Sequence, residues 1–353
     1  MSLTYKCNPS LPLKKNSSFK KNNYRTIDIH CHIYFENAAE LVKEEFNINN
    51  DYLYKFSNEA TRSVNLNQED SINNLITSID TRLEQMDKMG IDIQALSIAP
   101  IQYYYNLSPD LTNAAAQLIN NEISKIVLQH PNRFVGLATL PMQQPDLAIK
   151  ELKRSVNDLG MKGIEISTSV NGDELSNNKY LKFFEEVEKL GVLIFLHPSG
   201  FSDGQRLSNH YFSNVIGNPL DSTLAINHLI FGGVLDKYPD LKICVAHGGG
   251  YLPSYSGRID HAFDNRMDCR ECINQQPTSY LKKLYFDTVV FTQHQLEYLV
   301  NLYGSEHLLL GTDYPYDMGM YDPVGFISST KSLSDQDIKS IVGGNAAKIL
   351  NLL

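Results

Sequence analysis

Four histidines and one aspartate of this 353-residue chain stand where short apolar runs end. His30 and His32 close the first run, His197 the fifth, His247 the sixth and Asp313 the eighth. Residues i and i+2 of a strand project to the same face, so His30 and His32 can offer two imidazoles to one ion. Imidazole nitrogen and carboxylate oxygen are donors that suit zinc or a similar first-row metal. We therefore predict a metal site where these runs end, to which all five side chains could converge.

These residues must be positioned by strands, and the chain alternates short β-branched runs with helix-length amphipathic stretches. Several runs are almost continuously apolar, as at 192–196, which is typical of parallel strands covered on both faces. Eight strands are expected at 27–32, 93–98, 133–138, 162–167, 192–197, 242–247, 284–290 and 307–313.

The stretches between the runs predict helices that end at glycine or proline. An apolar stripe at Ile76, Ile79, Leu83 and Met86 precedes Gly90, where a C-terminal cap would lie. Similar stretches at 118–127, 146–159 and 180–190 end near a proline or a glycine. Residues 34–70 are expected to form a small lid-like insertion after the first strand.

Eight strand-then-helix units predict the α/β class and, within it, a closed (β/α)8 TIM barrel. Residues 26–353 would form this single domain. A doubly wound open sheet is the alternative, but no Gly-x-Gly-x-x-Gly or P-loop follows the first run. In a barrel, active sites lie at the carboxyl ends of the strands, where the five residues above would converge.

Composition narrows the class of protein. The first 25 residues hold six of the 31 Lys and Arg residues and none of the 40 Asp and Glu residues, so a basic extension precedes an acidic body. An acidic body argues against a nucleic-acid partner. No stretch approaches the roughly 18 apolar residues of a membrane span. Five irregularly spaced cysteines, including the Cys269-x-x-Cys272 pair, predict a reducing cytoplasm and no disulfide framework. The extension is expected to be a solvated tail, with targeting or subunit clasping as alternatives.

Several segments resemble the signatures of the amidohydrolase superfamily. More narrowly, they resemble the branch of 2-amino-3-carboxymuconate-6-semialdehyde decarboxylase and the related aromatic-acid decarboxylases. The likeness runs from about residue 27 to the end of the chain. The segments that carry it are Asp28-Ile29-His30-Cys31-His32, Arg133-Phe134-Val135-Gly136-Leu137-Ala138-Thr139-Leu140-Pro141-Met142, Leu196-His197-Pro198, Ala246-His247-Gly248-Gly249-Gly250, Gly311-Thr312-Asp313-Tyr314-Pro315 and Gly344-Asn345-Ala346.

The resemblance implies one divalent metal, zinc or alternatively manganese, held by His30, His32, His197 and Asp313. It implies that His247, as the acid/base residue, and Asp313 are catalytic. It also implies two arginines that hold substrate carboxylates: Arg266, supplied across a homodimer interface, and Arg62. The muconate decarboxylase of the branch has a tryptophan after its fifth-strand His-Pro. This chain has no tryptophan, and Phe201 is expected to take over that wall.

The implied reaction is non-oxidative decarboxylation of a carboxylated muconate semialdehyde or aromatic acid. Hydrolysis of an amide or lactone by the same site, and a non-catalytic scaffold with a structural metal, are the alternatives. Two-metal members of the superfamily carry a bridging Lys or Glu at the end of the fourth strand. Here that run ends in Ser167-Thr168, which favours one metal, although Glu165 keeps a second one open. The aromatic run Tyr103-Tyr104-Tyr105 is expected either to line the substrate pocket or to close the barrel rim.

Overall fold

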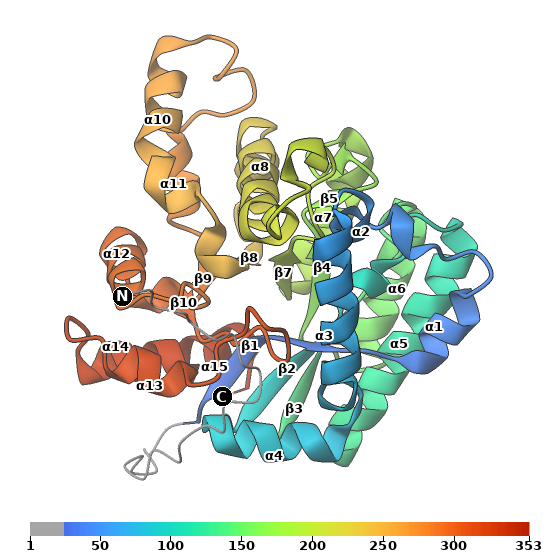
Figure 1. Ribbon diagram of the computed structural model, residues 1–353. Coiled ribbons are helices and arrows are strands. Elements are labelled where there is room, and N and C mark those ends of the chain that lie inside the picture. The colour runs from blue at the N-terminus through green and yellow to red at the C-terminus, as the bar shows by residue number, and fades with distance from the viewer. Residues whose placement is uncertain (1–24, 353) are drawn as a thin grey trace.

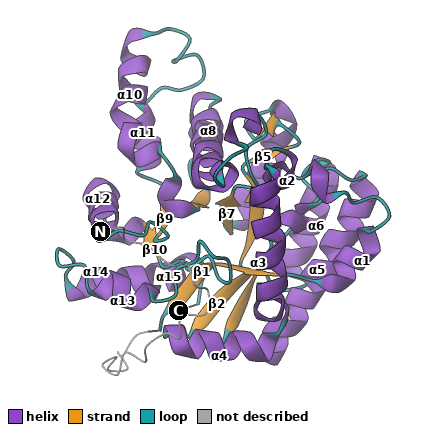
Figure 2. Cartoon of the chain, viewed as in Figure 1, coloured by secondary structure: helices purple, strands orange, loops and turns teal. Residues whose placement is uncertain are grey.

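The computed structural model describes residues 25–352, and its centre is a sheet of eight parallel strands surrounded by helices (Figures 1 and 2). The strands follow the order β1-β2-β3-β4-β7-β8-β9-β10. Their bounds are β1 Ile27–Ile33, β2 Ile93–Ile98, β3 Phe134–Ala138, β4 Gly163–Ser167, β7 Leu193–His197, β8 Lys242–Val245, β9 Tyr285–Asp287 and β10 Leu308–Leu309. A two-stranded hairpin, β5 (Ser169–Val170) and β6 (Asp173–Glu174), follows β4.

The last strand returns to the first, so the sheet closes into a ring. The backbone N–H of Ile29 donates to the carbonyl of Leu310 at 2.9 Å, and that of His32 donates to Tyr314 at 2.7 Å. Cys31 and Tyr314 form a parallel bridge beyond the end of β10. The expected (β/α)8 barrel is confirmed, and the doubly wound open sheet is excluded.

Three strands end earlier than the apolar runs indicated. The runs were expected to continue as strands to His247, Val290 and Asp313, but β8, β9 and β10 end at residues 245, 287 and 309. His247 has φ +56° and Asp313 has φ +58°, a left-handed conformation that interrupts an extended strand. These two side chains are therefore presented by turns just beyond the strands.

Helices cover the outside of the barrel. Gly90 (φ +72°) ends α4 and Gly191 (φ +64°) ends α7, as their positions after the apolar stripes predicted. The covering helices are α4 Ile79–Met89, α5 Pro109–Gln129, α6 Pro145–Asn157, α7 Leu181–Leu190, α8 Asn218–Phe231, α9 Val234–Lys237, α12 Gln293–Tyr303, α13 Pro323–Ser328, α14 Asp335–Lys339 and α15 Asn345–Ile349. Among these described helices none is long and apolar enough to cross a membrane.

Between β1 and α4 lies an insertion of three helices, α1 (Glu36–Val42), α2 (Tyr52–Lys55) and α3 (Glu59–Thr77), which we call the lid. The lid extends beyond residue 70, because α3 buries Ile72 and Ile76 against Ala99 at the rim of the barrel. Its packing therefore ties the lid to the carboxyl ends of β1 and β2.

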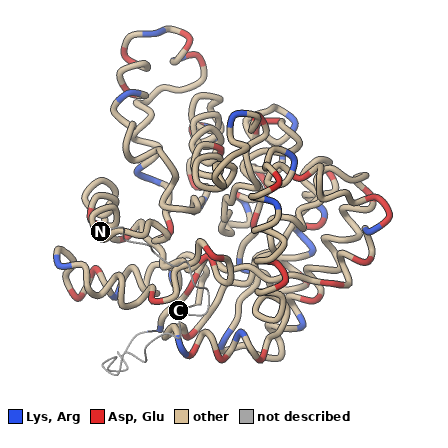
Figure 3. Tube along the Cα trace, viewed as in Figure 1, with Lys and Arg blue, Asp and Glu red and all other residues tan. Residues whose placement is uncertain are grey.

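A second extension, which we call the arm, consists of α10 (Leu252–Asn265), α11 (Pro277–Leu281) and the loop between them. It projects from the barrel (Figure 1), and the only residues that α10 buries are Leu252 and Pro253, in its first turn. Charged residues of both signs gather at its tip (Figure 3). Cys269 and Cys272 of the arm, like Cys31 and Cys244, are unpaired. The basic extension expected at residues 1–25 lies almost wholly outside the described residues.

Candidate active site and metal centre

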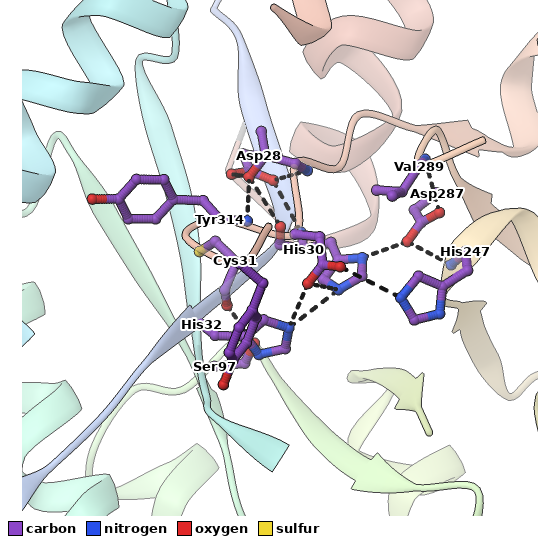
Figure 4. Close-up of polar contacts among 12 residues, drawn as sticks. Asp28, His30, Cys31, His32, Ser97, His247, Asp287, Val289 and Tyr314 are labelled. Carbon is purple, nitrogen blue, oxygen red and sulfur yellow. Dashed lines mark hydrogen bonds and ion pairs between the residues drawn. The ribbon is translucent and has the colours of Figure 1, made fainter. Parts of the chain in front are cut away.

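His30 and His32 point their rings into the mouth of the barrel from alternate positions of β1 (Figure 4). Both residues are fully buried. Nδ1 of His32 lies 2.9 Å from the carbonyl oxygen of Ile98, and Nδ1 of His30 lies 2.6 Å from a carboxylate oxygen of Asp287. A carbonyl oxygen can only accept, so Nδ1 of His32 carries the proton and its Nε2 carries a lone pair. The carboxylate fixes the same tautomer for His30 when that ring is neutral.

The two Nε2 atoms lie 3.2 Å apart, and Oδ1 of Asp313 lies 3.3 Å and 3.2 Å from them. Two facing lone pairs and a carboxylate oxygen repel one another unless a cation or protons lie between them. Donor atoms about 2.0–2.2 Å from one ion are separated by roughly 3.0–3.5 Å in right-angled to tetrahedral geometry. The observed separations fit a single divalent cation.

His197, at the end of β7, completes this set. Its ring lies 4.9 Å from that of His30 and 4.8 Å from that of His32, measured between ring centroids. Both ring nitrogens are buried and have no hydrogen-bond partner among the described residues. Such an orphan is costly, by about 1–3 kcal/mol, unless a ligand satisfies it. Burial, and then the neighbouring imidazoles, hold the pKa of His197 well below its usual value, so the ring is neutral and able to bind a metal.

Asp313 supplies the anionic donor. Burial alone would raise its pKa, but His30, His247 and His32 hold the pKa well below its usual value, so the side chain is a carboxylate. Its backbone N–H donates to the carbonyl of His30 at 2.8 Å. One donor atom from each of His30, His32, His197 and Asp313 lies within 4.8 Å of the others. We call these four residues the His–Asp cluster; their arrangement is suited to bind a divalent cation.

Glu165 does not belong to this cluster. It is fully buried on β4, and its carboxylate accepts a hydrogen bond of 2.5 Å from the hydroxyl of Tyr103. Tyr103 and Tyr105 stack with ring centroids 5.3 Å apart, and both line a separate cavity of about 230 Å³. The other oxygen of Glu165 is buried without a hydrogen-bond partner among the described residues, so Glu165 keeps a second metal open, as the sequence did.

Asp287, at the end of β9, has a role that the sequence did not reveal. Besides the ring of His30, its carboxylate accepts from the backbone N–H groups of His247 (2.9 Å), Gly248 (2.8 Å) and Val289 (3.1 Å). Burial alone would raise the pKa of Asp287. The hydrogen bond from His30, the charges of His30 and His247 and the backbone hydrogen bond from Gly248 together lower this pKa below its usual value. One carboxylate thus orients a cluster histidine and fixes the turn that carries His247.

Asp28 is a second buried carboxylate that sequence reasoning missed. It accepts from the Thr312 hydroxyl at 2.7 Å, from the Gln94 amide at 2.9 Å and from the backbone N–H of His30 at 3.1 Å. Burial raises its pKa to about 6, although these donors oppose the rise. Asp28 therefore joins β1 to the turn that carries Asp313. Neither Asp28 nor Asp287 stands in a spacing that signals such a role.

His247 lies beside the cluster, and its ring is more accessible. Its Nε2 is 3.7 Å from Oδ2 of Asp313, and its ring centroid is 5.1 Å from those of His30 and His197. The side chain is 16% exposed, whereas the ring of His30 is fully buried. His247 can therefore exchange protons with a molecule in the site.

Two cavities meet at His247 and Asp313. The larger, of about 460 Å³, is lined by aromatic side chains that include Tyr251, Phe291 and Tyr298. The smaller, of about 80 Å³, lies between the cluster and the lid. Pockets that enclose whole small ligands measure about 300–1,000 Å³. The larger cavity is therefore suited to the body of a substrate, and the smaller one to a substituent.

The three residues expected to contact substrate lie outside the lining of these two cavities. Arg62 donates to the carbonyl of Ser57 at 2.9 Å and to Asn49 at 3.1 Å, both within the lid. Phe201 packs against Gly217 before α8. Arg266 lies at the base of the arm loop, 64% exposed, and pairs with Asp268 at 2.7 Å. Their contacts with substrate stay predictions.

Comparison with known proteins gives relatives along the whole described chain. The amidohydrolase family model matches residues 27–352. A 2-amino-3-carboxymuconate-6-semialdehyde decarboxylase from Dictyostelium discoideum is 38% identical over 274 residues, which cover 77% of this chain and 76% of that protein.

Solved structures share the fold. A 5-carboxyvanillate decarboxylase from Sphingomonas paucimobilis superposes with a TM-score of 0.82 at 22% identity, covering 93% of this chain and 99% of that one. A dihydroxybenzoic acid decarboxylase from Polaromonas sp. JS666, with bound manganese and the inhibitor 2-nitroresorcinol, gives a TM-score of 0.78 at 26% identity. It covers 93% of this chain and 97% of that one.

Proposed function

The chain belongs to the amidohydrolase family, and from this premise we propose that it is a metal-dependent decarboxylase. Its substrate would be a carboxylated muconate semialdehyde or an aromatic acid, from which it releases CO2 without oxidation. The observation that carries the proposal is the His–Asp cluster with the accessible ring of His247 beside it.

The chain's residues would divide the work as follows. When bound by the His–Asp cluster, a divalent cation would supply Lewis acidity that polarises a substrate oxygen. Nε2 of His247 would hold a proton and deliver it to the carbon that bears the carboxylate. That carbon becomes tetrahedral, and the electron pair of its bond to the carboxylate returns to the conjugated system as CO2 leaves. Asp287 would keep the turn of His247 in place during the transfer, through the backbone N–H groups it accepts from.

Zinc is our proposal for the metal, and manganese is the alternative. Three imidazoles and one carboxylate are a donor set that zinc commonly takes. Manganese is the ion in the structure of the dihydroxybenzoic acid decarboxylase described above. Reconstitution of metal-free protein with each ion, followed by activity per bound ion, would decide between them.

A homodimer would supply the cation that the substrate carboxylate needs. Among the described residues, neither cavity that reaches His247 is lined by a Lys or an Arg. Arg266 lies on the projecting arm and is 64% exposed; in a dimer it would exchange its surface pair with Asp268 for the substrate carboxylate of a second copy. Two parallel N–H groups of an arginine would then hold the carboxylate at both oxygens. The exposed aromatic side chains of Phe291 and Tyr298 at the larger cavity would be covered by the same contact.

Decarboxylation is distinguished from hydrolysis by its products. The relatives named above are decarboxylases, which favours carbon–carbon cleavage over hydrolysis of an amide or lactone at the same centre. The test is an assay of the metal-loaded protein against carboxylated muconate semialdehydes, dihydroxybenzoates and lactones. We expect one CO2 per substrate consumed and no new carboxylate. A new carboxylate without CO2 would show that the protein is a hydrolase.

A further inference from the structure

The small cavity under the lid contains an acidic group that the reaction above does not use. Glu69 of α3 lines this cavity together with Tyr54, Tyr316 and the cluster residues His197 and Asp313. One end of the cavity is thus formed by the metal centre. The other end is formed by lid residues, and no Lys or Arg contributes to its described lining.

Glu69 is held as an acceptor at the lid end. The hydroxyl of Tyr54, on α2, donates to Oε1 of Glu69. Glu69 is partly open to solvent, and no donor to its Oε2 is found among the described residues. Partial burial raises the pKa of Glu69, and the hydrogen bond from Tyr54 opposes that rise.

Tyr316 lines the same cavity beside the metal centre. Its ring lies 5.3 Å from that of His32, between centroids. The lining of the cavity thus includes a ring beside the cluster as well as the carboxylate of Glu69.

We propose that Glu69 selects substrates that carry an amino or hydroxyl group next to the metal-bound end of the molecule. This group would enter the small cavity and donate a hydrogen bond to Glu69, while the ring or chain of the substrate occupies the larger cavity. A carboxylate in the small cavity would face Glu69 as a like charge and be rejected. The inference rests on the proposed function, because it places the substrate by reference to the same metal centre.

The experiment compares two probes that differ by one hydroxyl group. Binding of 2-nitroresorcinol and of 2-nitrophenol to the metal-loaded protein would be measured by calorimetry. Turnover of 2,6-dihydroxybenzoate, 2-amino-6-hydroxybenzoate and 2-hydroxybenzoate would be measured alongside. Wild type should prefer the probe with the second donor. Glu69→Leu should reduce that preference about tenfold or more, since a hydrogen bond to a charged group is lost. Glu69→Gln, which keeps an acceptor, should retain part of it.

Tyr54→Phe separates selection from a purely structural role. Like Glu69→Leu, it breaks the Tyr54–Glu69 hydrogen bond, but it leaves the carboxylate in the cavity. If the pair only clamps α2 to α3, both variants should lose stability and activity alike, for all substrates. If Glu69 selects, Tyr54→Phe should keep the preference and Glu69→Leu should lose it. Asp70→Asn, one residue further along α3 and outside the cavity lining, is the matched charge control and should resemble wild type.

The outcomes are distinguishable from a failure of the proposed function. If no substrate releases CO2, decarboxylation is wrong, while the binding ratio still decides the role of Glu69. Equal binding of the two probes by wild type, binding of neither, or an unchanged ratio in folded Glu69→Leu would overturn the inference. Glu69→Gln decides the question if Glu69→Leu does not fold. The inference would then be overturned if Glu69→Gln binds the two probes in the same ratio as wild type and Asp70→Asn do. Comparison of the amino and hydroxyl substrates identifies which donor Glu69 prefers.

Discussion

The two halves of the active site are built in different ways. On the barrel side, the rings of His30 and His32 are fully buried, and each Nδ1 is bound to a fixed acceptor within the barrel. On the outer side, Arg62 bonds within the lid, and Arg266 is 64% exposed on the arm. The metal-binding half is held by the closed sheet, whereas the two arginines proposed to bind substrate lie on insertions that follow individual strands.

This difference predicts which properties of the enzyme a substitution in each half would change. A buried ring with a fixed tautomer needs little further ordering when a metal binds, so His30 and His32 are preorganised. Residues on an insertion can be replaced without loss of the barrel, and the lid and the arm are therefore where substrate choice is expected to reside. Substitutions on the barrel side should change metal binding or chemistry for every substrate. Substitutions on the outer side should change the choice of substrate.

The largest effect that leaves the metal in place is expected for His247→Ala. The variant should keep metal content near that of wild type, because His247 lies outside the cluster. Its kcat should fall by about 10²–10⁴-fold, the usual contribution of an acid/base residue. Metal analysis and CO2 release measured on the same sample would test this. Loss of the metal would instead place His247 among the ligands.

Asp287→Asn should have the next largest effect, because Asp287 contacts both a metal-binding histidine, His30, and the turn that carries His247. Replacing the carboxylate weakens the acceptor for Nδ1 of His30 and for the turn of His247. Metal affinity or activity should fall about 10–100-fold, as for other residues that orient metal ligands. Asp287→Glu, which restores the charge, should recover part of the loss in metal affinity. A variant with unchanged metal affinity and unchanged kcat would refute this positioning role.

Arg266→Ala tests whether the outer half extends to a second chain. The variant should raise KM at least about tenfold, through loss of a charged hydrogen bond, and leave metal content unchanged. Arg270→Ala, on the same loop, is the matched control and should have a smaller effect. Mixing Arg266→Ala with His247→Ala should restore activity, because one site of the mixed dimer has both residues. No recovery in a mixture whose mixed dimers are verified would contradict supply of Arg266 by the partner.

The smallest effect concerns a buried contact on the barrel side, between α8 and the residue after β4. Asp221 of α8 is 5% exposed and accepts from the hydroxyl of Thr168, and burial raises its pKa to about 7. Its unfolded pKa is about 3.9, so the folded chain binds the extra proton between roughly pH 4 and 7. Stability from this group is therefore present at low pH and is lost as pH rises towards 7. Asp221→Asn should match the Tm of wild type near pH 4 and exceed it by a few degrees near pH 8. A Tm difference independent of pH would contradict this.

The cluster could be predicted from the sequence because its signals are local. His30 and His32 stand at alternating positions of one strand, and His197 closes an apolar run. The conformations of His247 and Asp313 could not be predicted, because a left-handed φ leaves no trace in an apolar pattern. For three strands, the predicted range therefore extended beyond the observed end. The gross architecture depended only on the alternation of runs and helices, so it was predicted correctly.

The sequence predicted an insertion after the first strand, but it could not place the supporting carboxylates or the packing of the lid. Asp28 and Asp287 act through residues distant in the chain, and an aspartate in or after a strand has no spacing that marks this role. Glu69 lies on a helix whose position over the mouth is set by the packing of Ile72 and Ile76. Tertiary contacts of this kind are outside the reach of periodicity.

The central claim is tested most directly by the metal stoichiometry of wild type and His197→Ala. His197 has no other hydrogen-bond partner among the described residues, so its removal should affect a bound ion and little else. Titration of metal-free protein with Zn2+ and with Mn2+ should give one ion per wild-type chain. In His197→Ala, which should remain folded, the affinity should fall at least about 100-fold. Full-affinity binding by the variant, or two ions in wild type, would contradict a single cation held by these four residues.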